Sequence, residues 1–195
     1  MKVEQTNIED CVVIKPTLHK DGRGVFFETF KDSEYYSIFG SRDFMQDNIS
    51  VSEKNVLRGL HYQTGDYVQA KLVRVLVGMV QDIVVDCRKG SPTYGNVFSK
   101  LLDGKEYAQI FVPRGCAHGF LTLQDNTVFS YKVDNTYNKE SESGIMYNDP
   151  DLKINWFLNK DEELNISVKD ATLPRWKECY KFQYSVSKII WLKHE

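Results

Sequence analysis

Two histidines of this chain stand in stretches whose neighbours suit a polar pocket. His61 lies in residues 56–63 and His118 in residues 112–120, and each apolar run also holds an arginine and a glycine. Imidazole has an unperturbed pKa near neutrality, so a histidine held in a pocket can move a proton or bind a metal. The chain has 4 histidines in all. Three interpretations of this pair are open: a metal site, a proton-transfer site, or histidines that fill a core.

Proton transfer by His61 needs an orienting carboxylate and an acid on the opposite face of the substrate. Asp170 and Tyr131 are candidates, because a carboxylate fixes the imidazole tautomer and a phenol can protonate a carbanion-like carbon. Lys71 could stabilise an enolate with its positive charge. The residue types alone do not bring these groups together. The alternative, with Tyr131 in the core and Asp170 in a turn, stays open.

Two further stretches carry groups suited to a phosphorylated ligand. Arg23 lies between two glycines and is followed by aromatic residues and Glu28; its guanidinium fork suits a phosphate. The alternative is a turn that leads into an edge strand. In residues 46–50, polar side chains alternate, so they face one side of a strand. A cluster of Arg58, Lys71 and Arg23 would form a positive site for a diphosphate.

The elements that must position these residues are mainly β-strands. Residues 68–86 form two apolar runs broken at Gly78, which predicts paired strands that meet at a turn. Further strands are predicted at 96–102, 109–112, 121–123 and 127–133. Short, regularly spaced strands favour an all-β antiparallel barrel or jelly roll. A short helix is predicted over residues 33–39.

The length and pattern predict one domain over residues 1–195. We expect N-terminal strands in 1–44, the jelly-roll core in about 45–150, and loops with short helical turns in 151–195. A jelly roll of the metal-binding cupin type typically has His-x-His and a downstream Glu on one strand. Here Gln63 stands where the second imidazole is needed, which argues against a bound metal.

Composition excludes several classes of partner. The 25 Lys and Arg residues against 27 Asp and Glu residues leave no broad basic field for a nucleic acid or a membrane surface. No run is long enough to span a bilayer, and the start lacks the apolar stretch of a signal peptide. The 4 cysteines are scattered and form no CxxC motif, so we expect reduced thiols in a cytoplasmic protein.

The motifs taken together resemble a known enzyme family. From about Lys15 to Asp170, the chain is similar to the dTDP-4-dehydrorhamnose 3,5-epimerases in the stretches DGRGVFFETF, QDNIS, VLRGLHYQ, QAKLVRVLVGMVQDIVVDCRKGSPTYG, VPRGCAHGFLTLQDN, YKVDNTY and NDPDLKINW. The resemblance implies a cupin jelly roll (a double-stranded β-helix) with a few short peripheral helices, no metal and no cofactor. It also implies a homodimer and a nucleotide-sugar substrate.

The resemblance also implies roles for individual residues. His61 matches the base, Asp170 its carboxylate partner, Tyr131 the acid on the other face, and Lys71 the cation at the keto oxygen. The residues that match substrate contacts are Arg23, Phe26, Glu28, Gln46, Asn48, Arg58, His118, Tyr137 and Glu142.

The implied reaction inverts C3 and C5 of a dTDP-linked 4-keto-6-deoxyhexose, on a route to a surface deoxysugar such as L-rhamnose. The alternatives are an epimerase acting at C3 or C5 alone, an epimerase of a GDP-linked sugar, a sugar-nucleotide 3,4-ketoisomerase, and a cupin that binds without turnover. Three departures from the family pattern bear on the identity of the substrate. Residues 64–68 lack the usual prolines beside the substrate mouth, and residues 147–150 read YNDP where WDDP is more usual. A longer, more apolar tail follows Arg175, and it could pack across a subunit boundary.

Overall fold

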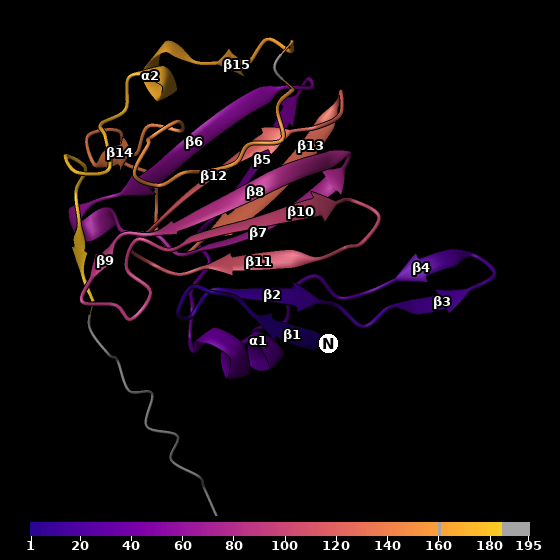
Figure 1. Cartoon of the computed structure of the whole chain (residues 1–195). Helices are drawn as coiled ribbons and strands as arrows, with labels where there is room; N and C mark the ends of the chain where they lie inside the picture. Colours follow the sequence, from indigo (N-terminus) through magenta and orange to yellow (C-terminus); the bar gives the residue numbers. More distant parts are fainter. Residues whose placement is uncertain (160, 185–195) are drawn as a thin grey trace, which may run out of the picture.

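The computed structural model describes residues 1–159 and 161–184, which form two large facing β-sheets (Figure 1). The first sheet has the order β1 (Lys2–Gln5), β2 (Val12–Lys15), β11 (Gln109–Val112), β7 (Lys71–Val77), β13 (Thr127–Val133), β5 (Gln46–Ser52). The second has the order β10 (Val97–Asp103), β8 (Met79–Asp86), β12 (Cys116–Thr122), β6 (Val56–Gln63), β14 (Glu142–Gly144), with β15 (Asn165–Ile166) also paired to β6. The predicted all-β fold is confirmed.

Successive strands alternate between the sheets, which makes the fold a jelly roll. The chain changes sheet between β5 and β6, between β7 and β8, between β10 and β11, and between β12 and β13. The prediction that residues 68–86 form paired strands is therefore wrong: β7 pairs with β11 and β13, and β8 pairs with β10 and β12. Gly78 joins them at φ +84°, where a Cβ would meet Thr127 Oγ1 at 2.4 Å. A glycine between two apolar runs is therefore equally compatible with a hairpin and with a connection between two sheets.

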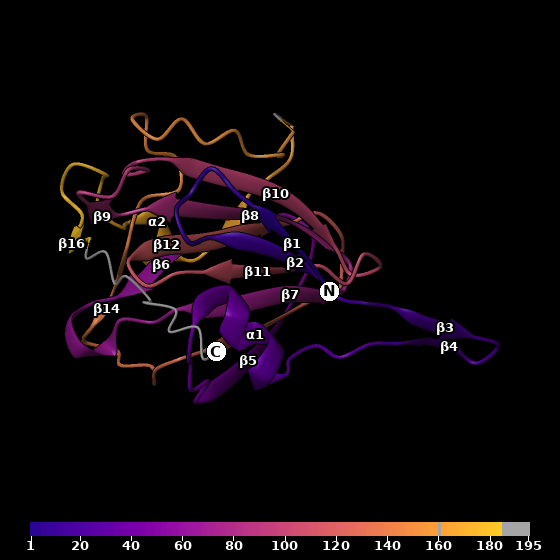
Figure 2. The ribbon, with the colours of Figure 1, turned by 90° about the horizontal axis from the view of Figure 1, so that it is seen from below.

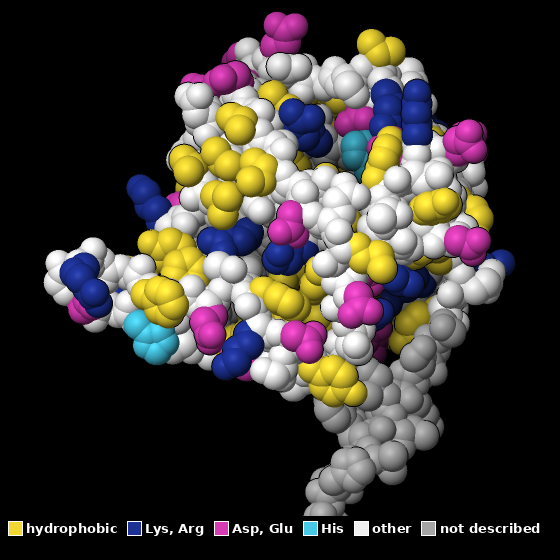
Figure 3. Space-filling view, turned by 180° about the vertical axis from the view of Figure 1, so that it is seen from behind, with side chains coloured by type: hydrophobic (Ala, Val, Ile, Leu, Met, Phe, Trp, Pro, Cys, Tyr) yellow, Lys and Arg dark blue, Asp and Glu magenta, His cyan; other side chains and the backbone are white. Residues whose placement is uncertain are grey.

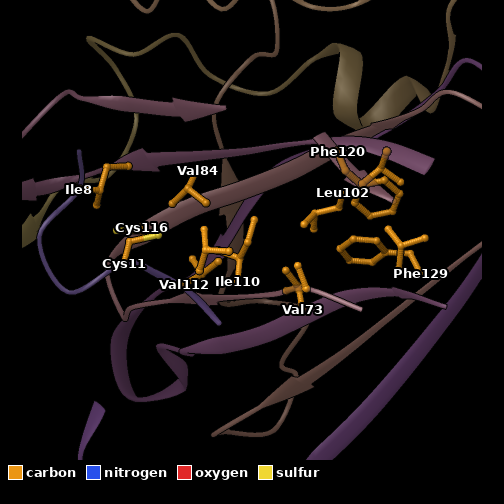
Figure 4. Packing of buried hydrophobic residues seen from close by; sticks show 14 residues of the cluster. Ile8, Cys11, Val73, Val84, Leu102, Ile110, Val112, Cys116, Phe120 and Phe129 are labelled. Atoms are coloured by element: carbon orange, nitrogen blue, oxygen red, sulfur yellow. The ribbon is translucent and has the colours of Figure 1, made fainter. Parts of the chain in front are cut away.

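The space between the sheets is filled by apolar side chains from both (Figure 4). Val73, Ile110 and Phe129 come from the first sheet and are fully buried. Val84 and Phe120 come from the second, and the rings of Phe120 and Phe129 stack at 4.1 Å. Each large apolar side chain removed from water contributes about 1.5–3 kcal/mol. This packing fixes the distance between the two sheets.

The outer face of the first sheet is covered at one end by α1 (Asp32–Phe39) (Figure 2). The helix was predicted over residues 33–39 and begins one residue earlier. It buries Tyr35 and Phe39, and the Phe39 ring stacks on Phe111 at 4.1 Å. The other end of this face carries exposed Ile49, Val51 and other apolar side chains.

A hairpin of β3 (His19–Asp21) and β4 (Gly24–Phe26) extends away from the two sheets as an arm (Figures 1 and 2). Its turn is closed by Asp21, which accepts hydrogen bonds from the Arg23 backbone and guanidinium. The arm's side chains are exposed on both faces.

The C-terminal part crosses the second sheet as loops, with a single turn of helix, α2 (Val168–Ala171), near β6 (Figure 1). Ser167 caps α2 by accepting from the Asp170 backbone N–H. The short strands β9 (Arg88–Lys89) and β16 (Phe182–Gln183) pair with each other, and a 3₁₀ turn, η1, spans Gly65–Tyr67. Within the described ranges, no helix is long and apolar enough to cross a membrane. The part of the predicted tail from residue 185 to 195 lies outside the described residues.

Candidate active site

A cavity of about 630 Å³ opens between the two sheets. Strands of both sheets line it, together with the segment that carries α2. Figure 3 shows a hollow in which a histidine lies among basic and acidic side chains. The candidate residues that line the cavity are Asn48, Arg58, His61, Lys71, His118, Tyr131, Glu142 and Asp170. The structure thus gathers eight of the thirteen candidates in one place.

His61 and Asp170 form a hydrogen-bonded pair at the wall made by the second sheet. His61 Nε2 lies 2.8 Å from Asp170 Oδ1, and Asp170 Oδ2 accepts from the Gly59 backbone N–H at 3.0 Å. Burial opposes ionisation of Asp170, but the hydrogen bonds from His61, Gly59 and Ser167 outweigh it and lower the pKa of the carboxyl. An ionised carboxylate on Nε2–H leaves Nδ1 as the basic nitrogen.

A bulge in β6 brings Arg58 and His61 to the same side. His118 pairs with His61 and Phe120 pairs with Arg58, so three steps along β6 oppose two steps along β12. Residues three apart in a regular strand face opposite sides, yet both Arg58 and His61 line the cavity. The strands approach closely here, because a Cβ on Gly119 would lie 2.7 Å from the Arg58 carbonyl oxygen.

Tyr131 faces the cavity from the opposite sheet. It lies on β13, beside Asn48 of β5, whereas His61 lies on β6 of the second sheet. Burial raises the pKa of the phenol, Arg58 opposes that rise, and Glu142 adds to it. The hydroxyl therefore stays protonated at neutral pH. The two walls thus present a base with its carboxylate on one side and a proton donor on the other.

Lys71 lies on the inner face of β7 with 9% of its surface exposed. Its Nζ donates to the His61 carbonyl oxygen at 3.3 Å. Burial lowers the pKa of the ammonium to about 8, and the carboxylates of Asp82 and Glu142 limit the fall. The cavity therefore contains a lysine that carries a positive charge at neutral pH with little solvent around it.

A polar rim surrounds this centre. Glu142 accepts from Tyr137 Oη at 2.7 Å and pairs with Lys169 Nζ at 2.5 Å. Burial opposes ionisation of Glu142, but these two partners outweigh it and lower its pKa. Gln46 donates to Asn48 Oδ1 at 2.8 Å and accepts from the Tyr137 backbone N–H at 3.1 Å. Gln46 and Tyr137 thus support the rim without lining the cavity.

Comparison with known proteins agrees with this geometry. A family model described as dTDP-4-dehydrorhamnose 3,5-epimerase matches residues 5–178. The chain belongs to the dTDP-4-dehydrorhamnose 3,5-epimerase family. The chain is 43% identical to the dTDP-4-dehydrorhamnose 3,5-epimerase of Salmonella typhimurium over 175 residues. This match covers 89% of this chain and 94% of the Salmonella protein. Proteins of this name are isomerases.

Solved structures of the epimerase family share the fold. The Legionella pneumophila dTDP-6-deoxy-D-glucose-3,5-epimerase in complex with dTDP-4-keto-L-rhamnose superposes with a TM-score of 0.89 at 40% identity, covering 94% of this chain and 98% of that one. ChmJ of Streptomyces bikiniensis, a 3'-monoepimerase in complex with dTDP-quinovose, gives 0.80 at 32% identity, covering 87% and 85%. The predicted cupin jelly roll is confirmed, and the similar structures include both a 3,5-epimerase and a 3'-monoepimerase.

Besides Gln46 and Tyr137, three more candidate residues do not line this epimerase cavity. The Arg23 side chain is 91% exposed and paired with Asp21, Phe26 is 70% exposed, and neither they nor Glu28 line the cavity. All three belong to the arm or the segment after it, which extends away from the sheets. The predicted cluster of Arg58, Lys71 and Arg23 is therefore wrong within one chain. Residues 64–68 do not line the cavity, and their predicted place at its mouth stays a prediction.

Sequence reasoning missed two charged residues of the site. Lys169 lines the cavity and pairs with Glu142, and Asp82 is buried against His118 beneath it. Lys169 is adjacent to Asp170, so the SVKD stretch already held the signal. Asp82 stands in an apolar strand run, where an acidic residue needs a partner to be buried.

Gln63, which argued against a metal, is buried in a structural role. Its Oε1 accepts from the Asn138 backbone N–H at 2.9 Å. In the part of the chain that the structure describes, no group of three or more His, Cys, Asp or Glu residues is placed to hold a metal ion.

Proposed function

We propose that this protein inverts C3 and C5 of a dTDP-linked 4-keto-6-deoxyhexose by proton transfer through an enolate. The observation that carries the proposal is the His61–Asp170 pair on one sheet facing Tyr131 on the other across one cavity. The C4 ketone acidifies the C–H bonds beside it, and inversion changes no oxidation state. A base on one face and an acid on the other are the groups that the reaction needs.

The steps follow from the placement of the side chains. His61 Nδ1 takes the proton from the carbon next to the ketone, and Asp170 stabilises the imidazolium on Nε2–H. Lys71 supplies positive charge to the oxygen of the enolate in a site with little water. Tyr131 then delivers its proton from the opposite face, which inverts the centre. His118 contributes to the same wall as His61.

The nucleotide diphosphate binds along β5 and β6 in this proposal. Arg58 lines the cavity with its guanidinium near Tyr131, and Asn48 adds an amide held by Gln46. Arginine suits bidentate binding of phosphate oxygens. Tyr137 and Glu142 close the far side of the rim, with Glu142 held by Lys169.

A homodimer completes the site by bringing the arm of a second copy to the cavity. β5 is a sheet edge and carries Ile49 and Val51, whose side chains are 65% and 62% exposed; Val77, on β7 two strands away, is 56% exposed. Free strand edges and exposed apolar faces favour pairing with another chain. A partner's arm on this edge would place the equivalents of Arg23, Phe26 and Glu28 next to Asn48. We expect such a dimer in the cytoplasm, where nucleotide sugars are made.

Arm exchange is testable by mixing two inactive variants. His61→Asn lacks the base and Arg23→Ala lacks the arm's arginine, but a mixed dimer contains one site with both. Refolding or co-expressing the pair should restore up to about half of the activity per mixed dimer. If each chain served its own cavity, the mixture would stay as inactive as the separate variants.

The activity itself is tested by hydrogen exchange. The protein is incubated with dTDP-4-keto-6-deoxyglucose in D2O, and deuterium is followed at each ring carbon by NMR. Label at C3 and C5 with inversion of both supports the double epimerase, whereas label at one centre assigns a single epimerase such as the 3'-monoepimerase above. Migration of the ketone to C3 would identify a ketoisomerase. Tight binding without exchange would contradict the enzymatic proposal. The same assay with a GDP-linked 4-keto-6-deoxyhexose tests which nucleotide the enzyme prefers.

A further inference from the structure

A second histidine–carboxylate pair lies beneath the cavity. His118 Nε2 is 2.9 Å from Asp82 Oδ2, with side chains 6% and 0% exposed. Both residues lie on the inner face of the second sheet, on the neighbouring strands β12 and β8. The other carboxylate oxygen of Asp82, Oδ1, is buried and has no hydrogen-bond partner among the described residues. A buried carboxylate with one oxygen unpartnered is costly, so its presence calls for an explanation.

The surroundings of Asp82 point to a role in the cavity. Asp82 is one of two carboxylates that act on Lys71, the other being Glu142 on β14. Among the described residues, the one side chain that hydrogen-bonds to its carboxylate is His118, which lines the cavity directly opposite His61 in the strand register. The other ionisable groups around this centre are Arg58, Tyr131, Lys169 and Asp170. One buried negative charge thus lies behind two of the groups that face the substrate.

We propose that Asp82 is a positioning residue of the reaction, which holds His118 with Nε2–H on the carboxylate and Nδ1 toward the substrate. The proposal rests on the proposed epimerase function. Asp82 does not touch the substrate and acts through its two neighbours. When negative charge develops on the keto oxygen, the Lys71 ammonium already lies in the cavity, so no reorganisation is needed at that moment. If the role of Asp82 were limited to folding, its loss would leave the pH profile of kcat and the titration of Lys71 unchanged.

Asp82→Asn tests this role, because the amide keeps the size and one acceptor but removes the charge. We expect kcat to fall by roughly 10- to 100-fold, less than for the loss of a direct donor, with dTDP affinity unchanged by calorimetry. Lys71 loses a carboxylate that favours its ammonium, so the alkaline limb of the kcat profile should move to lower pH. The 13C NMR titration of the Lys71 side chain should move the same way.

Asp86→Asn is the matched control. Asp86 lies on the same strand and is also fully buried, but it pairs with Arg88 and bonds Ser91 and Thr93, away from the cavity. This variant should lose stability while keeping the pH profile and the Lys71 titration. Equal pH profiles for Asp82→Asn and the wild type, in folded protein, would overturn the proposal.

A measurement on the wild-type protein covers the case in which Asp82→Asn does not fold. Long-range 15N NMR of labelled histidine, assigned with His118→Gln, should find the proton of His118 on Nε2. A neutral ring protonated on Nδ1 alone would overturn the proposal. The tautomer and the Lys71 titration decide the role of Asp82 separately from turnover, so a wild type without deuterium exchange would contradict the proposed function alone.

Discussion

The two histidines of the cavity are cross-strand neighbours with the same kind of partner, yet they differ in access. The His61 side chain is 25% exposed and its carboxylate comes from the C-terminal segment. The His118 side chain is 6% exposed and its carboxylate comes from the adjacent strand of the same sheet. Asp170 also accepts a hydrogen bond from the Gly59 backbone, whereas one oxygen of Asp82 has no partner in the described part of the chain.

This difference shows that the chemistry of a His–Asp pair depends on where it stands. The exposed ring with a well-bonded carboxylate suits a base that must meet a substrate and release its proton. The buried ring of His118 is held in one orientation and contributes to the electrostatic field of the cavity. Identical residue types, directly opposite in one sheet, thus divide the work between them.

The largest effect should come from removing the base. We expect His61→Asn to reduce deuterium exchange by roughly 10²- to 10⁴-fold, with dTDP affinity retained by calorimetry. His118→Asn should reduce kcat by about tenfold to a hundredfold, because a group that orients the substrate is lost. Equal losses of activity in the two variants would contradict the different roles of the His61–Asp170 and His118–Asp82 pairs.

Removing the acid separates the two walls of the cavity. In Tyr131→Phe, His61 still takes the proton and can return a deuteron to the same face. Exchange should therefore continue while inversion falls by roughly 10²-fold, as measured by the ratio of label to inverted product in NMR. A parallel loss of exchange and inversion would assign Tyr131 to binding instead of proton delivery.

A smaller effect should follow from disturbing the bulge that aligns the two histidines. In Gly119→Ala the new Cβ would lie 2.7 Å from the Arg58 carbonyl oxygen, so the strands must move apart. We expect a loss of about 1–3 kcal/mol in the free energy of unfolding and about a tenfold lower kcat. Gly22→Ala is the control for stability, since a Cβ there meets nothing within 4 Å. Unchanged stability in Gly119→Ala would show that the strands adapt freely.

The smallest effect concerns the charge of Lys71. Its pKa falls from 10.5 to about 8 on folding, so between these values the unfolded chain binds more protons and stability rises with pH. Lys71→Met should therefore increase the free energy of unfolding at pH 7 by about 1–3 kcal/mol, and the gain should shrink above pH 8. Urea unfolding at pH 7 and pH 10 measures this. In the wild type, kcat should fall as pH rises through about 8.

The strands and the residue types of the site were predictable from local patterns. The alternation of Gln46, Asn48 and Ser50 predicted one polar face, and these side chains are half-buried whereas those of Asp47 and Ile49 are exposed. The helix of residues 33–39 was predicted to within one residue. The division of residues 1–195 into parts, the individual roles and the homodimer stay predictions.

The pairing of strands was not predictable from the same patterns. An apolar run broken by glycine is compatible with a hairpin and with a sheet-changing corner, because both need a positive φ. The position of Arg23, Phe26 and Glu28 relative to the cavity was not predictable either. The sequence of a motif does not show whether its residues contact the cavity of their own chain or that of a second copy. Short-range spacing in the sequence determines neither which strands pair nor which cavity these three residues contact.

The sequence by itself determined the all-β class, the family, and the histidine, tyrosine, lysine and carboxylate from which the site is built. The tertiary structure decided which of them meet. Asp170 reaches His61 across 109 positions of the chain, and the bulge at Gly59 turns Arg58 and His61 to one side. The structure alone also placed Asp82 behind His118. The physical reason is that alternation along a strand sets only a local face, whereas register and packing between strands depend on contacts from the whole chain.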